Sequence, residues 1–378
     1  MSSETPGLRP VWGEVDLAAV RANTRVLAEL ARPASLLAVV KADAYGHGAV
    51  PVARAALDAG ATWLGVALVE EGATLRDAGI DAPILVLSEP APAAANAVVA
   101  HRLTPVVYTL VGIEALAKAV VDTGGGAPLP VHLKVDTGMH RAGCQVEDAR
   151  GFVDAIGARP ELTLEGICTH LAVADEPDHS YTTDQVAIFD ALLDDLDAAG
   201  ARPPLVHAAN SAGLLASPSA HYDLVRVGIA LYGVPPSDAL AERADLVPVL
   251  SLRARVAHVK ELAEGSRVSY GLRYELSRAG RIATVPVGYA DGVPRNLGLV
   301  GGEVLVRGRR FPVAGTVTMD QLLVDVGDVP VEVGDDVVLL GRQGDEEITA
   351  GEWARRLGTI AYEIVTGIGP RVPRRYVG

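Results

Sequence analysis

A lysine follows an apolar run, at a position where a reactive side chain can be expected. Residues 36–40 are apolar without alternation, which is typical of a strand buried on both faces of a parallel sheet, and Lys41 comes directly after them. Parallel α/β proteins place their reactive groups at the carboxyl ends of such strands. A partly buried lysine amine can lose its proton and form a Schiff base with a carbonyl group. A snorkelling side chain or a buried ion pair fits this stretch equally well.

Lysine is a rare residue in this chain. Lys41, Lys118, Lys134 and Lys260 are the only lysines among 33 basic residues, so arginine supplies nearly every other cation. A lysine amine can become neutral and nucleophilic, whereas an arginine guanidinium stays charged. The composition therefore favours a chemical requirement for lysine at residue 41.

Other polar side chains also stand at the ends of apolar segments. They are Tyr45 beyond Lys41, Lys134 with Arg141, His170, Asn210 with Ser211, and Arg226 with Gly228 and Ile229. In a parallel barrel the last two loops usually bind phosphate; Ser211 offers a hydroxyl and Gly228 permits close backbone approach. Each residue alone also fits an ordinary helix cap or tight turn. A Schiff-base lysine and a phosphate site on one rim are together the two anchors of pyridoxal phosphate.

A repeating pattern of strands and helices must position these residues. Eight compact apolar strands are predicted at 36–40, 62–67, 84–87, 104–108, 131–135, 162–169, 205–208 and 224–231. Alanine-rich helices are predicted between them at 49–59, 70–78, 110–121, 146–156 and 183–199. A strand spacing of roughly 27 residues suits a (β/α)8 barrel of ~250 residues. An open doubly wound sheet is the competing architecture, but the chain has no glycine-rich dinucleotide fingerprint.

The pattern changes after Gly233. Period-two strands with glycine turns are predicted at 249–259, 281–287, 302–306, 321–326 and 336–340, with one helix near 350–357. We therefore expect an α/β fold, a TIM-type barrel over 11–242 followed by a smaller antiparallel β domain over 243–378, with residues 1–10 associated with the latter. Within the barrel part, residues 12–15 are predicted as a strand, and Asp16 as the N-cap of a helix over 17–31.

Composition excludes several classes of protein. The chain is 49% hydrophobic but only 4% aromatic, so its core must be built from Val, Leu, Ile and Ala. A net charge of −14 argues against nucleic acid or an anionic membrane as partner. Cys144 and Cys168 are too few for a disulfide framework, and no metal site is expected. The first ten residues hold no apolar core and no run approaches ~18 apolar residues, so we expect a cytoplasmic protein.

A series of motifs gives a specific resemblance. In chain order they are VVKADAYGHG, KVDTGMHRAG, THLAVAD, HAANSAG, RVGIALYG, VSYG, VPVGYADG and GTVTMDQ. Read together, they resemble alanine racemases, a family of fold-type-III pyridoxal-phosphate enzymes, over essentially the whole chain. The resemblance implies interconversion of L- and D-alanine in a homodimer with shared active sites, supplying D-alanine for peptidoglycan.

The resemblance also implies two catalytic bases. Lys41 would hold pyridoxal phosphate and act on one face of the substrate, and Tyr270 from the second subunit would act on the other. Racemisation needs two such bases because the α-proton leaves one face and returns to the other. Without the resemblance, Tyr270 reads as an aromatic residue at a strand-to-turn corner.

Further roles are implied for residues around these bases. His170 and Arg226 would line up behind the tyrosine, with Arg226 also at the pyridine nitrogen. Arg141 would meet the cofactor's phenolic oxygen and the substrate carboxylate, and Lys134, carbamylated in some members, would orient it. The backbone N–H of Met319, beside Asp320, would also contact the carboxylate, from the second subunit. The remaining implied residues are Tyr45, Asn210, Ser211, Gly228 and Ile229 for the cofactor, and Tyr289, Asp175 and Arg295 for substrate access.

The sequence departs from the family pattern in two places. Gly369-Pro370 precedes Arg371, where the family often has a tyrosine, so one hydroxyl near the phosphate is absent. Thr318 precedes Met319, where cysteine is common, which should be a mild change.

Three other functions compete with this interpretation. A fold-type-III decarboxylase of basic amino acids favours an acidic residue at the pyridine nitrogen and a cysteine at the second face, where this chain offers Arg226 and Tyr270. A non-enzymatic cofactor-holding barrel lacks a C-terminal β domain. A broader racemase that also accepts serine differs only by a hydroxymethyl group, which pockets discriminate weakly.

Overall fold

The computed structural model describes residues 8–378, which form two compact units. The barrel unit comprises residues 20–44 and 48–247, and the β unit comprises residues 8–19, 45–47 and 248–378. Residues 8–10 belong to the β unit, while residues 1–7, for which the same association is predicted, lie outside the described residues.

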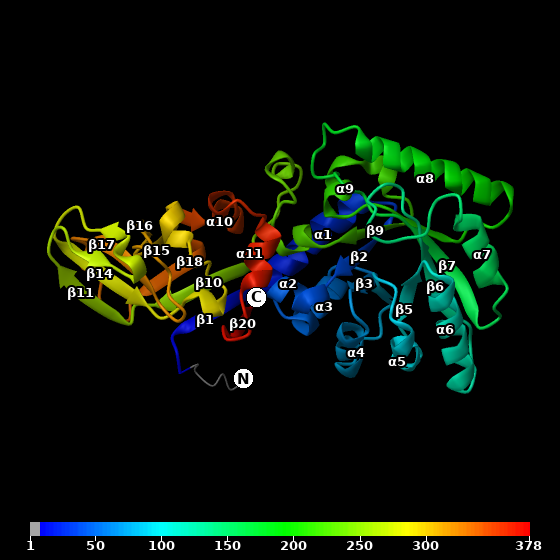
Figure 1. Ribbon diagram of the computed structural model, residues 1–378, viewed down its shortest axis with the longest axis horizontal. Helices are drawn as coiled ribbons and strands as arrows, with labels where there is room; N and C mark the ends of the chain where they lie inside the picture. The colour runs from blue at the N-terminus through cyan, green and yellow to red at the C-terminus, as the bar shows by residue number, and fades with distance from the viewer. Residues whose placement is uncertain (1–7) are drawn as a thin grey trace. The chain divides into compact units, whose positions relative to one another are not determined.

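Eight parallel strands build the barrel unit (Figure 1). They are hydrogen-bonded in the order β8 (Leu205–His207), β7 (Leu162–Cys168), β6 (Leu129–Lys134), β5 (Thr104–Val107), β4 (Ile84–Val86), β3 (Trp63–Val66), β2 (Ser35–Val39), β9 (Leu224–Val227). The end strands β8 and β9 meet through backbone hydrogen bonds. Asp223 N–H donates to Val206 C=O and Arg226 N–H to Ala209 C=O, both at 3.0 Å. The predicted barrel is confirmed.

Helices alternate with these strands and lie along the outside of the strand ring in Figure 1. They are α3 (Ala49–Asp58), α4 (Val69–Asp77), α5 (Ala95–Ala100), α6 (Leu110–Asp122), α7 (Ala149–Gly157), α8 (Tyr181–Ala198) and α9 (Ser211–Ala216). The short helices α5 and α9 were not predicted, because six residues carry too little periodicity. All four residues of β9 and Leu36–Val39 of β2 are buried, which explains apolar runs without alternation.

The β unit contains mainly antiparallel sheets. Its seven-stranded sheet consists of β16 (Arg309–Pro312), β15 (Glu303–Val306), β18 (Asp336–Gln343), β10 (Leu250–Arg255), β1 (Val11–Asp16) and β20 (Arg374–Val377) in that order, with β19 (Glu346–Ile348) paired to β18. A second sheet holds β11 (His258–Leu262), β14 (Gly280–Val285) and β17 (Leu322–Gly327), and β12 (Arg267–Val268) pairs with β13 (Tyr274–Glu275). Helices α10 (Ala350–Leu357) and α11 (Ala361–Gly367) follow.

The structure corrects three predictions about this unit. Residues 11–16 were placed in the barrel, but β1 lies between β10 and β20, because its backbone groups pair with strands from the far end of the chain. Residues 249–259 were predicted as one strand. The chain instead changes sheets at residues 256–257, since Val256 N–H donates to Asp335 C=O and Ala257 N–H to Thr284 C=O. Helix α11 was not predicted.

The start of α1 (Leu17–Ala31) follows its prediction. Oδ1 of Asp16 accepts the backbone N–H of Ala19 at 3.0 Å, which satisfies a donor that the first helical turn leaves unpaired.

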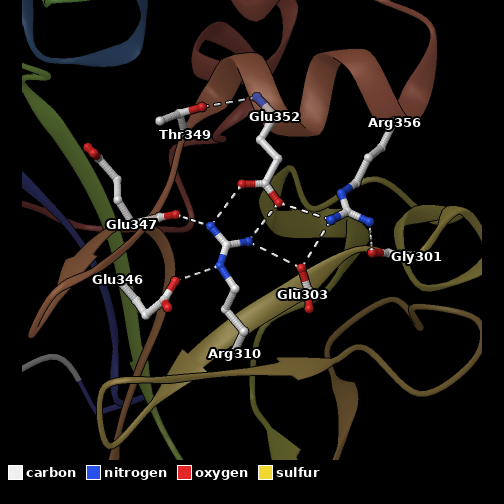
Figure 2. Close-up of polar contacts among 8 residues, drawn as sticks. All are labelled: Gly301, Glu303, Arg310, Glu346, Glu347, Thr349, Glu352 and Arg356. Atoms are coloured by element: carbon white, nitrogen blue, oxygen red, sulfur yellow. Dashed lines mark hydrogen bonds and ion pairs between the residues drawn. The ribbon is translucent and has the colours of Figure 1, made fainter.

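An ion-pair cluster joins two β hairpins to α10 (Figure 2). Arg310 of β16 contacts Glu346 at 2.8 Å, Glu352 at 2.9 Å and Glu303 at 3.2 Å. Arg356 contacts Glu303 at 3.0 Å and Glu352 at 3.1 Å. Because the two guanidinium groups share the carboxylates of Glu303 and Glu352, each of these four side chains is held by more than one partner, which reduces the entropy lost per contact.

Candidate active site

Lys41 stands at the carboxyl end of β2, where the sequence predicts it. Its side chain is half-buried, and burial lowers the pKa of its amine. The positive charge of Arg141 lowers this pKa further, while the carboxylate of Glu71 raises it. A lowered pKa increases the share of the neutral amine, the form that can attack a carbonyl carbon or accept a proton.

A left-handed turn follows Lys41, within α2 (Lys41–Gly46). The four consecutive residues Ala42, Asp43, Ala44 and Tyr45 have φ between 52° and 54°. This conformation costs L-residues on the order of 1–2 kcal/mol each. Local sequence signals gave no indication of it, because none of these four residues is glycine or asparagine.

Arg226 on β9 holds two histidines. Its Nη1 donates to Nδ1 of His207 at 2.8 Å and its Nη2 to Nδ1 of His170 at 3.2 Å. Nη2 also donates to the carbonyl oxygens of Thr169 at 2.8 Å and Ala208 at 2.9 Å. A guanidinium has only donors, so both Nδ1 atoms accept, and each neutral imidazole carries its proton on Nε2.

These two histidines are held in the neutral form. Burial lowers the pKa of His170 and of His207 well below the ordinary histidine value, and the charge of Arg226 lowers both further. Neutral His170 therefore presents an Nε2–H donor, which can stabilise an anionic oxygen without itself carrying charge.

The hydrogen-bond chain continues beyond His207. Its Nε2 lies 2.8 Å from Nδ1 of His132, and Nε2 of His132 lies 3.3 Å from a carboxylate oxygen of Glu165. The sequence analysis missed His132, His207 and Glu165. One signal for His132 was available: it stands two residues before Lys134 on β6, so both side chains face the same side of the strand.

Lys134 lies in the same cationic cluster. It is in register with Cys168 of β7, and burial lowers the pKa of its amine. The charges of Arg226 and Arg141 lower that pKa further. The structure therefore brings Lys41, Lys134, Arg141 and Arg226 close enough for their charges to interact around His170.

Side chains of α8 fix the loops that carry Arg141 and His170. The buried amide of Gln185 donates to the hydroxyl of Thr137 at 3.2 Å and to the carbonyl of His170 at 3.1 Å. The hydroxyl of Tyr181 donates to the carbonyl of Gly138 at 3.0 Å. Sequence reasoning did not find Gln185, because only the fold brings α8 beside these loops.

The predicted phosphate residues meet at the ends of β8 and β9. The hydroxyl oxygen of Ser211 accepts the N–H of Gly228 at 2.9 Å and that of Ala230 at 3.4 Å. Asn210 caps α9, since its side chain accepts the N–H of Gly213 at 2.9 Å. Ile229 is buried and begins a 3-10 turn over Ile229–Tyr232. Because the Ser211 oxygen accepts two N–H groups, its own O–H is left to donate, which suits phosphate.

Two further predicted residues, Asp175 and Tyr45, make other contacts. Asp175 is exposed, and its carbonyl accepts the hydroxyl of Ser237 at 2.6 Å. Tyr45 belongs to the β unit, where its ring centroid lies 6.3 Å from that of Tyr362, and burial raises the pKa of its phenol to about 12.

The β unit gathers a second set of predicted residues. The exposed fractions of Tyr270, Met319 and Tyr289 are 68%, 52% and 40%, high values for large apolar or aromatic side chains. Arg295 and Asp320 are exposed as well.

Backbone contacts hold these loops together. The hydroxyl of Thr316 donates to the carbonyl of Tyr270 at 3.1 Å, and the N–H of Tyr289 donates to the carbonyl of Thr318 at 2.9 Å. A Cβ on Gly288 would lie 2.3 Å from that same carbonyl oxygen, so only glycine permits this approach. Tyr270, Tyr289 and Met319 therefore belong to one exposed surface of the β unit.

The fold and site define a class of protein. The chain combines a parallel barrel, which carries a half-buried lysine at its carboxyl rim, with an antiparallel β unit. Barrel enzymes place their reactive groups at this rim. The family model "Alanine racemase, N-terminal domain" matches residues 15–236, and "Alanine racemase, C-terminal domain" matches residues 249–376. The chain belongs to the alanine racemase family, which confirms the resemblance seen in its motifs.

Individual relatives agree with this assignment. The chain is 52% identical over 373 residues to an alanine racemase from Symbiobacterium thermophilum, covering 98% of each chain. The crystal structure of alanine racemase from Streptomyces lavendulae superposes with a TM-score of 0.92 at 42% identity, covering 98% of this chain and 97% of that one. A histidine racemase from Leuconostoc mesenteroides is also similar, with a TM-score of 0.89 and 33% identity, covering 98% and 99%. The fold alone therefore does not specify the side chain of the substrate.

Among residues 8–378, no helix has both the length and the apolar composition that crossing a membrane requires.

Proposed function

We propose that the protein is an amino acid isomerase that interconverts L- and D-alanine with bound pyridoxal phosphate. The observation that supports this best is the half-buried Lys41 amine, whose pKa burial lowers, at a rim shared with Arg141 and Arg226. In a cytoplasmic homodimer, the product D-alanine would serve peptidoglycan synthesis.

The donor set fits this cofactor. Lys41 offers the amine that joins its aldehyde, Ser211 offers a hydroxyl for the phosphate beside Gly228, and Arg226 offers a permanently charged donor for the ring nitrogen. Tyr45, Asn210 and Ile229 would complete the binding site. The bound cofactor supplies an electron sink that makes the α-hydrogen of the amino acid acidic.

The two proposed bases are Lys41 and Tyr270 of the partner subunit. The Lys41 amine would move the α-proton on one face of the substrate, and the Tyr270 phenol would move it on the other. Exposure of 68% suits a tyrosine that acts on a second chain. The Nε2–H of neutral His170 would stabilise the phenolate form of the tyrosine.

Residues of two subunits would orient the substrate. Arg141 of one subunit and the backbone N–H of Met319 of the partner subunit would bind the substrate carboxylate. Lys134 would orient Arg141, and because burial lowers the pKa of Lys134, its amine is suited to carbamylation. Tyr289, Arg295, Asp175 and Asp320 would line the access path.

Proton NMR of the cofactor-loaded protein with L-alanine in D2O, combined with chiral analysis, tests the proposal. We expect the α-proton signal to disappear while D-alanine appears. Exchange without D-alanine would mean that Lys41 acts but Tyr270 is not in place. No exchange would contradict the proposed function.

A broader racemase is the second candidate, supported by the histidine racemase that shares this fold. Serine and histidine in the same assay separate the two, since a strict alanine enzyme leaves their α-protons unexchanged. Release of CO2 from lysine, ornithine or diaminopimelate would instead indicate a decarboxylase.

A further inference from the structure

The carboxylate of Glu71 bridges two loops of the barrel rim. Its Oε1 accepts the backbone N–H of Ala42 at 2.6 Å, directly beside Lys41. Its Oε2 accepts the N–H groups of Ala67 at 2.8 Å and Leu68 at 3.1 Å, at the start of α4. One side chain therefore ties the backbone next to Lys41 to the adjacent strand–helix connection.

The segment that Glu71 holds is sterically disfavoured. Ala42 begins the left-handed run of four residues that includes no glycine, and such a run persists only where neighbouring groups fix it. Other contacts also contribute, among them the N–H of Ala44 to the carbonyl of Val40 at 2.8 Å, that of Gly48 to the carbonyl of Asp43 at 2.9 Å and that of Ala49 to Oδ1 of Asp43 at 2.7 Å. Glu71 acts on the residue next to Lys41, where a change in the turn would displace the amine most.

Three charged or titratable groups act on the Lys41 amine. Arg141 lowers its pKa in addition to burial, and the carboxylate of Glu71 raises it. The third group, His170, interacts with Lys41 electrostatically and is kept neutral by burial and by Arg226. Glu71 is the acidic member of this set.

We propose that Glu71 is a positioning residue for Lys41, clamping the left-handed turn through the N–H of Ala42 and balancing the charge of Arg141 at the amine. The inference rests on the proposed function insofar as Lys41 is the reactive group. It assigns Glu71 no contact with the substrate.

Glu89 is a matched control. Its Oε2 accepts the N–H groups of Tyr108 at 2.5 Å and Thr109 at 2.8 Å, and its Oε1 accepts the hydroxyl of Thr109 at 2.6 Å. It therefore holds a rim loop in the same manner as Glu71, but its loop does not carry Lys41.

Hydrogen–deuterium exchange of the full-length protein tests the clamp. In Glu71→Ala, we expect exchange of the amides of residues 42–45 to accelerate by roughly tenfold or more, because a hydrogen bond to a charged acceptor is lost. In Glu89→Ala, exchange of this segment should stay at the wild-type rate. Unchanged exchange in Glu71→Ala would overturn the clamp. If Glu71→Ala does not fold, Glu71→Met, which keeps the side-chain length and removes both acceptor oxygens, serves in its place, with Glu89→Met as its control.

Labelling of lysine amines against pH tests the charge balance. The chain has only four lysines, so peptide-resolved mass spectrometry can follow Lys41 against the exposed Lys118 and Lys260. We expect Glu71→Gln to lower the pH midpoint of Lys41 labelling by about one unit, as expected on removal of a nearby opposite charge. The midpoints of Lys118 and Lys260, and that of Lys41 in Glu89→Gln, should not move.

An unchanged Lys41 midpoint in Glu71→Gln would overturn the charge balance. Because labelling is measured without substrate, this result does not depend on racemase activity. Repeating the labelling after saturation with pyridoxal phosphate tests the proposed function separately, since the cofactor should protect Lys41 in the wild-type protein.

Discussion

Arg226 donates from Nη1 to Nδ1 of His207 over 2.8 Å, with both side chains buried in the barrel. This contact fixes which atom donates and which accepts in each hydrogen bond from Arg226 through the histidines to Glu165. Arg226 can only donate, so His207 must accept at Nδ1 and donate from Nε2 to His132, which in turn donates to Glu165. The guanidinium is thus oriented by neutral imidazoles and backbone carbonyls, and it keeps its full charge for the site.

Reversing the charge at Arg226 should change the outcome of the reaction. In the proposed binding mode, Arg226 lies at the ring nitrogen of the cofactor, where a permanent cation would oppose protonation and so favour return of the proton to the substrate α-carbon. In Arg226→Glu we expect racemisation to fall by at least roughly 100-fold and pyruvate to form from alanine by transamination. Chiral chromatography and a coupled pyruvate assay measure both.

Arg226→Lys is the control, because it keeps the charge and loses only the forked geometry. It should lose activity without forming pyruvate. If the Arg226→Glu variant still binds the cofactor but forms no pyruvate, the charge at this position does not control return of the proton.

The buried histidines should make stability depend on pH. The pKa values of His132, His170 and His207 are all lowered in the folded protein, chiefly by burial. Below the unfolded pKa of ~6.5 the unfolded chain binds protons that the folded chain does not. The stabilisation is therefore complete above this pH and is lost as pH falls, by up to about 1.4 kcal/mol per pH unit for each histidine.

Urea unfolding between about pH 7.5 and about pH 5.5 measures this slope. His207→Gln removes one of the three groups and should give a shallower slope. His258→Gln, at an exposed position, should keep the wild-type slope. Equal slopes for wild type and His207→Gln would show that His207 does not contribute to the pH dependence of stability.

The Arg310 cluster should contribute measurably to the stability of the β unit. Its central side chain is 29% exposed and contacts three carboxylates, so Arg310→Met leaves like charges facing one another. We expect the free energy of unfolding to fall by about 1–2 kcal/mol, after allowance for solvent screening. The loss should shrink in high salt.

An exposed ion pair of the barrel unit provides the comparison. Arg102 and Asp81 are 3.1 Å apart with side chains 72% and 83% exposed. Arg102→Met should change stability by less than about 0.5 kcal/mol. A similar loss in both variants would mean that the cluster adds nothing beyond isolated pairs.

Local periodicity explains why much of this fold could be predicted. Continuous apolar runs such as residues 36–40 reflect burial on both faces of β2, and their regular spacing predicts the barrel. The same runs place Lys41 at a strand end. Residues 12–15 were correctly predicted as a strand, but β1 pairs with the distant strands β10 and β20. No local signal reveals this pairing, so its assignment to the barrel was wrong.

The parts of the site that were missed depend on tertiary contacts. The left-handed turn at Ala42–Tyr45 opposes the intrinsic preference of its residues, and the contact between Glu71 and Ala42 that holds it joins positions 29 residues apart. His132 and His207 meet only because their strands both border β7. Arg226 was predicted from its motif, but its four hydrogen-bond acceptors became visible only in the fold.

Complementation between inactive variants should reveal whether two chains share each active site. Lys41→Ala removes one proposed base and Tyr270→Phe removes the other, so each homodimer should be inactive. In a mixed dimer, one site would combine both defects, while the other would pair the intact Lys41 of one chain with the intact Tyr270 of its partner. Random exchange of equal amounts makes half of the dimers mixed, so about a quarter of wild-type activity should return.

The measurement is racemisation rate after the two variants are mixed, dissociated and reassociated, with each variant treated alone as control. Recovery requires both that the protein is a dimer and that Tyr270 acts on the partner's site. If both bases of a site came from one chain, every site would keep its own defect and the mixture would stay inactive. Restored activity therefore distinguishes a shared site from two independent ones, which the 68% exposure of Tyr270 by itself does not.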